Sequence, residues 1–273
     1  MIPESDKMST RSNERREPTS PAVDPPEPDP HHPLAVRRAA MLTAVIGLVH
    51  ALLLISADLL LMTRTPGVKA SDEELVAFYL DPGERRVVVV AGLYLLPFAA
   101  IAFIWFLVAL RMWISASAPR VNLLLSNVQL VCGIVYTTLM LAAGGALSVV
   151  ATSVELSDEP VDPLLARQLP QYGASLFLVF ALRMAAMFVL TSTNLGRISG
   201  ILPRWFIYVG FVVALVLLLT ASLNSWLTLV FPAWIIAFCV ILIDRARRIP
   251  RDFMVREVGE IEARRALQPN PRH

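Results

Sequence analysis

The chain has 273 residues, of which 56% are hydrophobic, and its formal net charge at pH 7 is +2. Soluble domains average about 45–50% apolar residues, and here the excess lies in blocks of about twenty residues, the length that spans a hydrocarbon core. A purely soluble fold is therefore excluded. The small net charge lacks the basic footprint of a nucleic-acid-binding protein, so no nucleic-acid partner is expected.

Residues 1–36 are predicted to form a disordered cytoplasmic tail. The segment PAVDPPEPDPHHP is dense in proline and acidic residues and nearly free of large apolar side chains. Such a composition cannot bury enough surface to fold alone. The first apolar run, from about residue 39, is too long for a cleaved signal peptide and is expected to act as a signal anchor.

Six apolar segments follow, and each is predicted to be a transmembrane helix. The spans are expected at about 39–62, 87–110, 121–150, 173–193, 204–222 and 224–243. The last two are separated by so few residues that they form a tight antiparallel hairpin. The predicted fold is therefore all-α, a polytopic membrane helix bundle that occupies residues 37–243.

Two short helices are predicted in the loops on the outer side. Ser71 and Glu74 have the S-x-x-E spacing of a capping box, and the helix that they begin is expected to end at Asp81. Asp162 and Pro163 have the residue types of an N-cap followed by the first helical position, which indicates a second short helix that runs through Leu169.

Lysine and arginine residues near the ends of the spans predict the orientation, because such residues are enriched on the cytoplasmic side. If the N-terminus is cytoplasmic, the inner side carries Arg37, Arg38, Arg111, Arg120, Arg197, Arg204, Arg245, Arg247, Arg248, Arg251 and Arg256, and the outer side carries Arg64, Lys69, Arg85, Arg86 and Arg167. The larger inner set favours a multi-pass protein of the cell membrane with both termini in the cytoplasm.

Residues 244–273 are predicted to form a basic cytoplasmic tail. Met254, Val258 and Ile261 recur near the helical period, which indicates an amphipathic helix. Its arginines can attract anionic headgroups, so an anionic lipid is a candidate partner of this tail beside the bilayer itself. The alternative is that these arginines only enforce the topology.

Arg183 lies in the middle of the fourth predicted span. It is about ten residues from either end of that span, which places it about 15 Å from each interface at a rise of 1.5 Å per residue. A guanidinium that faced lipid at this depth would cost at least about 2.5–3.5 kcal/mol. Arg183 is therefore expected to face protein or water and to have a polar partner.

Depth in the membrane selects the partners of Arg183. His50 and Gln129 are both expected near the midplane, and Tyr136 shares a helix face with Gln129. Asp58 is the one acidic residue within a predicted span, and an arginine–carboxylate pair is the strongest geometry on offer. The five residues are predicted to form a buried polar cluster. This cluster either fixes helix packing or binds an anionic group or passes protons.

The sequence supplies no catalytic residue, cofactor site or metal site. Cys132 and Cys239 lie in apolar spans without metal-ligand spacing and are expected to be buried free thiols. Gly173-Ala174-Ser175 faintly suggests an intramembrane serine protease, but no histidine follows in a later span to act as its base. The motifs HExxH, GxGxxG and the P-loop do not occur.

Three stretches together resemble a loose group of uncharacterised bacterial multi-spanning membrane proteins. They are ASDEELVAFYLDPGERR, LRMAAMFVLTSTNLGRISGILPRWFIYVG and LVFPAWI, and the likeness covers roughly residues 40–243. The resemblance implies a membrane fold and carries no activity with it.

The function predicted from the sequence is that of a non-enzymatic membrane component or partner subunit, with protein partners that the sequence does not identify. The alternative is a small-solute or ion transporter or channel in which Arg183 faces the path. A membrane enzyme would need a reactive constellation that the sequence does not contain.

Overall fold

The computed structural model describes residues 32–67, 69–117, 122–157, 160–219 and 225–267, with side chains from residue 37 to residue 248 outside the gaps at 68, 116–121, 158–159 and 220–225. The chain divides into two units, residues 1–30 and 31–273, and the described residues belong to the second. The predicted N-terminal tail therefore lies almost wholly outside the described residues, as do the side chains of the predicted C-terminal helix.

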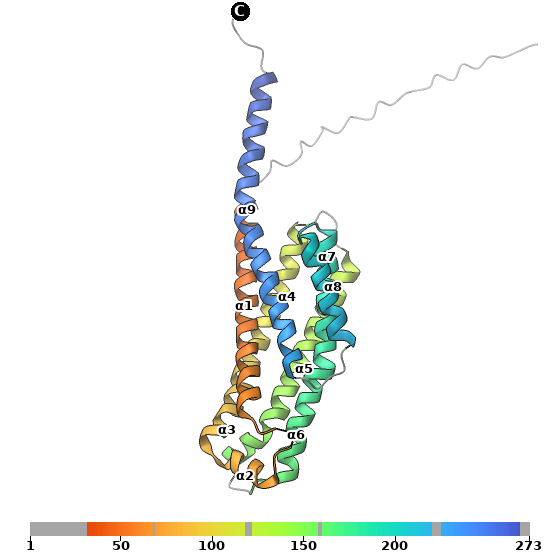
Figure 1. Cartoon of the computed structure of the whole chain (residues 1–273). Coiled ribbons are helices and arrows are strands. Elements are labelled where there is room, and N and C mark those ends of the chain that lie inside the picture. The colour runs from red at the N-terminus through yellow and green to blue at the C-terminus, as the bar shows by residue number, and fades with distance from the viewer. Residues whose placement is uncertain (1–31, 68, 118–121, 158–159, 220–224, 268–273) are drawn as a thin grey trace, which may run out of the picture. The chain divides into compact units, whose positions relative to one another are not determined.

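Every regular element in this part of the chain is a helix, so the predicted all-α class is confirmed (Figure 1). The elements are α1 (His32–Arg64), α2 (Asp72–Leu80), α3 (Pro82–Val89), the π-helix η1 (Val90–Leu95), α4 (Leu96–Ser117), α5 (Leu123–Leu156), α6 (Pro163–Ser175), the π-helix η2 (Leu176–Ala181), α7 (Leu182–Ile198), α8 (Arg204–Leu219), the 3₁₀ helix η3 (Ser225–Leu229) and α9 (Val230–Leu267). Helix α1 packs against α4 and α9, α5 packs against α4, α6 and α7, and α7 packs against α8.

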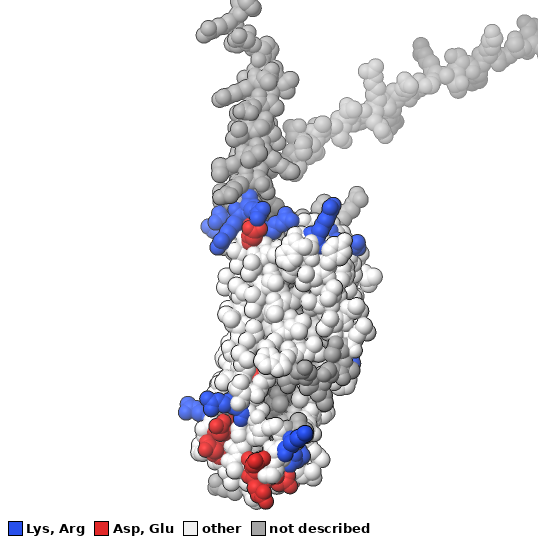
Figure 2. Space-filling view, viewed as in Figure 1, with Lys and Arg blue, Asp and Glu red and all other residues white. Residues whose placement is uncertain are grey.

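Five described stretches are long and apolar enough to cross a membrane, and they are Arg37–Arg64, Pro82–Ser115, Leu123–Leu156, Pro163–Ile198 and Trp226–Arg248. Helix α8 has 16 residues, which is about 24 Å against a hydrocarbon core of about 30 Å. The predicted fifth span and its tight turn continue into residues that the structure does not describe. In Figure 2 the visible side of the bundle is largely uncharged, and charged residues gather at its two ends.

The helix starts predicted in the outer loops are confirmed, but one helix end is not where the sequence placed it. The Ser71 hydroxyl accepts from the Glu74 N–H, and the Glu74 carboxylate accepts in return from the Ser71 N–H. Asp162 caps α6 at the N–H of Leu164. Helix α6 then continues through Pro170 into η2 and α7, so the second short helix is the N-terminal part of the fourth long helix.

Two π-helical segments interrupt the long helices beside internal prolines. Segment η1 precedes Pro97, and the Leu96 N–H bonds to the Ala91 carbonyl, five residues back. Segment η2 follows Pro170, which lies inside α6. A proline has no N–H to donate and its ring crowds the preceding turn, so the change in hydrogen-bond register in η1 relieves both conflicts at Pro97.

Close contact between α5 and α6 depends on Gly173. A Cβ atom at this position would lie 2.9 Å from the carbonyl oxygen of Ala143 and 3.1 Å from the backbone nitrogen of Leu147. Both neighbours are backbone atoms, which cannot move out of the way as a flexible side chain can. The absence of a side chain at Gly173 therefore sets how closely these two helices approach, and with it the position of the elements that follow.

We expect the substitution Gly173→Val to destabilise the protein by about 1–3 kcal/mol, the usual cost of overpacking. The matched control is Gly145→Val on α5, because a Cβ atom at Gly145 meets nothing within 4 Å. The control should change the free energy of unfolding by less than about 0.5 kcal/mol. Denaturant titration of the full-length protein in one detergent compares the two variants, and equal losses would contradict the proposed contact.

Candidate functional site

The centre of the bundle is a cluster of fully buried aromatic side chains around Tyr136. The ring centroid of Tyr136 in α5 lies 5.1 Å from that of Phe103 in α4 and 4.9 Å from that of Phe231 in α9. Phe188 of α7 completes the cluster, 5.2 Å from Phe103. Edge-to-face ring pairs of this kind join four long helices, so the polar side chains among them are held in a rigid apolar environment.

His50 of α1 enters this aromatic cluster with one ring nitrogen engaged and the other without a partner. Its Nδ1 lies 2.8 Å from the carbonyl oxygen of Ala99 in α4. A carbonyl only accepts hydrogen bonds, so Nδ1 carries the hydrogen and a neutral ring presents the lone pair of Nε2. Nε2 is buried without a hydrogen-bond partner. The Tyr136 ring lies 6.4 Å from the His50 ring, and the Tyr136 hydroxyl is likewise buried without a partner.

Asp58 lies two turns beyond His50 on α1, toward the end of the bundle where that helix stops. Thr228 of η3 is its side-chain hydrogen-bond partner. The other carboxylate oxygen, Oδ2, is buried without a partner, and Tyr136 is close enough to Asp58 to interact with it electrostatically. The side chains of Asp58, Tyr136 and His50 thus converge from two helices, and we call these three residues the polar core.

Among the described residues, the hydrogen bonds of Arg183 and Gln129 go to groups outside the polar core. Arg183 is half-buried in the first turn of α7, and its guanidinium donates to the carbonyl oxygen of Val179, one turn earlier. No ion pair joins Arg183 to Asp58 among the described residues, which corrects the predicted arginine–carboxylate pair. The amide of Gln129 donates to the hydroxyl of Ser192 at 2.6 Å and so links α5 to α7.

The physical reason for this difference is the direction of each side chain around its helix. Counting residues placed His50, Gln129 and Arg183 at similar depth, but depth does not determine which way a side chain points once helices pack. A backbone carbonyl one turn away accepts from the Arg183 guanidinium, so this contact of Arg183 lies within its own helix. The sequence signal for the polar core was Asp58, because it is the one acidic residue within a predicted span.

A second feature is a cavity of about 630 Å³ at the end of the bundle where α1 stops. Its walls come from the end of α1, from α2, α5 and α6, and from η3, and they are mainly apolar. The polar groups that line it include Arg167 and Gln171 of α6 and Thr63 and Thr65 at the end of α1. Trp226 closes one side. We call this space the outer cavity.

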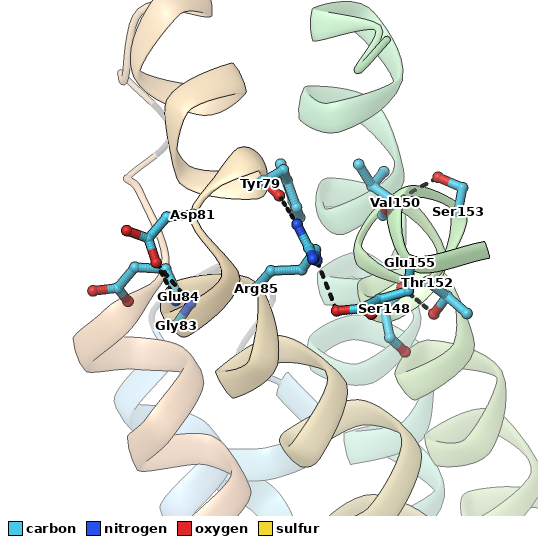
Figure 3. A network of polar contacts seen from close by, with 10 residues as sticks. All are labelled: Tyr79, Asp81, Gly83, Glu84, Arg85, Ser148, Val150, Thr152, Ser153 and Glu155. Atoms are coloured by element: carbon cyan, nitrogen blue, oxygen red, sulfur yellow. Dashed lines mark hydrogen bonds and ion pairs between the residues drawn. The ribbon is translucent and has the colours of Figure 1, made fainter. Parts of the chain in front are cut away.

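Helices α2 and α3 form a small cap at this end of the bundle, and two arginines hold it in place. The Arg85 Nε lies 2.9 Å from the Glu155 carboxylate, and Arg85 also donates to the carbonyl oxygen of Tyr79 at 3.0 Å (Figure 3). Arg167 donates to the Asp72 carboxylate at 2.7 Å and so ties α6 to α2. Beneath these contacts lies a separate small core that consists of Phe78, Tyr79, Val88, Val150, Ala151 and Ala166.

Sequence reasoning missed the cap, and no local pattern could have revealed it. Arg85 and Glu155 are 70 residues apart, and Arg167 and Asp72 are 95 residues apart. The sequence analysis used the arginines only as indicators of orientation. Pairing between them and distant acids depends on how α2 and α3 fold back against α5 and α6, and that is a property of the packed bundle.

In the part of the chain that the structure describes, no group of three or more His, Cys, Asp or Glu side chains is arranged to hold a metal ion. Cys132 and Cys239 are buried free thiols. Long apolar helices with an apolar outer surface and a few buried polar side chains define the class of helical membrane-embedded proteins. Comparison with protein-family models, curated proteins and solved structures finds no match for this chain.

We expect the stability of the cap to fall at high pH because of Tyr79. Burial raises the pKa of Tyr79 to about 12, from an ordinary value of about 10. The unfolded phenol therefore loses its proton before the folded one, so this contribution to stability is complete below pH ~10 and is lost as pH rises to ~12.

The measurement is an absorbance titration of phenolate formation in the full-length protein, compared with the variant Tyr79→Phe. The difference between the two curves should show a single transition near pH 12. A difference curve with its midpoint near pH 10, the ordinary value for tyrosine, would show that Tyr79 is not buried as described.

Proposed function

We propose that the protein is a six-pass integral protein of the cell membrane, with both termini in the cytoplasm. In this proposal α8 and its continuation form the fifth of six spans. The position of α9 supports it, because its C-terminal part runs toward the same end of the bundle as the start of α1 (Figure 1). Two termini on one side of the membrane require an even number of crossings.

Charge supports the proposed orientation. The end of the bundle that carries the start of α1 has exposed arginines and, among the described side chains there, one acidic residue, Asp244 (Figure 2). The opposite end, where the cap lies, mixes both signs, and Arg64, Arg85 and Arg167 there form ion pairs with acids. Cytoplasmic loops carry the excess of basic residues, so the cap is assigned to the outer side.

Within this topology we propose a non-enzymatic membrane component that binds an amphiphilic ligand in the outer cavity. The observation that carries the proposal is the outer cavity itself, which falls within the range of about 300–1,000 Å³ typical of ligand pockets. Its mainly apolar walls suit an acyl or similar chain. The Arg167 guanidinium, which donates to the Asp72 carboxylate and to the Ala70 carbonyl oxygen, places a positive charge in the lining that suits an anionic head.

The level of the outer cavity also favours an amphiphile. Thr63 and Thr65 line it where the apolar stretch of α1 ends, which in the proposed topology is the level of the outer headgroups. A molecule at this level has its polar end near water and its apolar end beside the bundle. The lining supplies shape, apolar contact and a guanidinium, and these are the means of binding rather than of bond breaking.

The alternative is a small-solute or ion transporter built around Arg183. It receives less support, because the Arg183 guanidinium is engaged by a carbonyl of its own helix. An anionic lipid at the C-terminal tail and unidentified protein partners stay predictions, since the side chains of that tail lie outside the described residues. The resemblance to bacterial multi-spanning membrane proteins also stays a prediction.

Cysteine labelling in intact cells tests the topology. Cys132 and Cys239 are buried, so the background from the native thiols is low. Glu73→Cys on α2 should react with a membrane-impermeant maleimide, whereas Arg247→Cys on α9 should react only after the membrane is permeabilised. Labelling of Arg247→Cys in intact cells would overturn the assignment of both termini to the cytoplasm.

Binding of a brominated fatty acid tests the ligand, because bromine quenches the fluorescence of Trp226 in the cavity wall. We expect saturable quenching of the wild-type protein in detergent and its loss in Trp226→Phe. Gly67 also lines the cavity, and a Cβ atom there meets nothing within 4 Å. Gly67→Phe should therefore fill the cavity without disturbing the fold and weaken binding by about tenfold or more, ~1.4 kcal/mol.

The matched control is Gly145→Phe, because a Cβ atom at Gly145 is equally unobstructed and the residue does not line the cavity. It should bind the fatty acid as the wild type does. Quenching that is non-saturable and equal in all variants would mean that the fatty acid partitions into the micelle, and the proposed ligand site would be rejected.

A further inference from the structure

The polar core presents three buried polar atoms without hydrogen-bond partners, and they are Asp58 Oδ2, the Tyr136 hydroxyl and His50 Nε2. His50 and Tyr136 have no exposed surface, and Asp58 is 7% exposed. Buried polar atoms in proteins nearly always have partners, so an isolated exception needs a physical reason. Glu84 Oε2, Thr193 Oγ1 and Trp234 Nε1 are also buried without partners. The three atoms of the polar core differ because their residues interact, His50 through its ring and Asp58 through its charge, with Tyr136, and this grouping indicates that a ligand belongs there.

The charges around Asp58 define what that ligand must be. A carboxylate that is buried without a counter-charge costs several kcal/mol, and the Thr228 hydroxyl offsets only part of such a cost. No Lys or Arg side chain forms an ion pair with Asp58 among the described residues. The site is therefore short of one positive charge.

The elements packed around the polar core do not supply this charge. Helix α4 contributes Ala99 and Phe103, α7 contributes Phe188, and α9 contributes Phe231. The other titratable side chains that these elements bring near are two thiols. Cys239 of α9 packs at Gly47, one turn from His50, and Cys132 lies one turn from Tyr136 on α5. Neither thiol carries a positive charge in any state. Arg183 of α7 is bonded to Val179.

We propose that the polar core is a proton-binding site in which Asp58 carries the proton and Tyr136 and His50 continue the site inward. Protonation forms an O–H bond on the Asp58 carboxylate, the proton comes from water, and the product is a neutral carboxylic acid that can remain buried. A metal cation is disfavoured because aromatic rings, not oxygen atoms, make up most of the surrounding surface.

The proton reaches the site from the outer cavity. Leu59, the residue after Asp58, lines that cavity, and so does Trp226, two residues before the Asp58 partner Thr228. The exposed fraction of the residue falls from 7% at Asp58 to zero at Tyr136 and His50, so we expect the proton to enter from the Asp58 end of the site. The proton site does not depend on the proposed amphiphile, because Asp58, Tyr136 and His50 do not line the cavity.

Infrared spectroscopy of the full-length protein in detergent tests the proposal, because a protonated carboxyl group has a C=O stretching band that a carboxylate lacks. We expect the wild type to show this band at neutral pH, where exposed acids are ionised. Asp58→Asn should abolish it, and the control Asp244→Asn, an exposed residue at the opposite end, should leave it unchanged. Tyr136→Phe should shift its frequency, because a neighbouring hydroxyl is lost.

Three outcomes would overturn the proposal. The first is a wild-type spectrum without the band, which requires no variant to fold. The second is loss of the band when sodium chloride is added at constant pH, which would show that a cation replaces the proton. The third applies if Asp58→Asn does not fold, and it is a band of unaltered frequency in Tyr136→Phe. Failure of fatty-acid binding would leave all three measurements unaffected.

Discussion

The central constraint on this molecule is that polar groups inside an apolar helix bundle must find their hydrogen-bond partners within the protein. Most of its hydroxyl groups meet this constraint locally. Thr43, Thr137 and Thr191 each donate to the carbonyl oxygen four residues earlier in their own helix. Arg183 uses the same arrangement when it donates to Val179. The cation that stands out most in the sequence thus makes its hydrogen bond within its own helix.

Where local partners do not suffice, the bundle joins helices through single polar contacts. His50 connects α1 to α4 through Ala99, and Gln129 connects α5 to α7 through Ser192. In the polar core this solution is incomplete, since three polar atoms lack partners in the protein. Glu84, Thr193 and Trp234 also bury a polar atom without a partner, but in the polar core such atoms belong to residues that interact with one another, and there the proposed proton completes the site.

The end of the bundle that carries the cap is held together by ion pairs and a small apolar core. Arg85 and Arg167 are partly exposed to solvent, with 13% and 31% of their side chains accessible, so their ion pairs bring limited stability through charge alone. Their effect is geometric, because they fasten α2 and α3 onto α5 and α6 above a small apolar core. The outer cavity exists because this cap is built over the end of α1. The proposed ligand site and the proposed proton site therefore occupy neighbouring levels of one structure.

The sequence by itself determined the helical class, the approximate extents of the long helices and the caps of the short ones. These features depend on apolar composition over about twenty residues and on residue types at fixed local spacing, which are properties of short stretches of chain. It also identified Asp58, His50 and Tyr136 as unusual, because their polarity conflicts with their surroundings. The continuation of α6 through Pro170 was not foreseen, since a proline ordinarily ends a helix.

Only the tertiary structure decided which polar residues meet. Packing against α4 and α9 turned His50 and Asp58 toward Tyr136, whereas Arg183 turned to its own helix. The ion pairs of the cap and the lining of the cavity beneath it bring together residues far apart in the chain, so no periodic pattern in the sequence predicts them. The physical reason is that residue spacing along a helix determines depth and relative direction on that helix, while the direction in which each helix faces its neighbours is set by side-chain packing over the whole bundle.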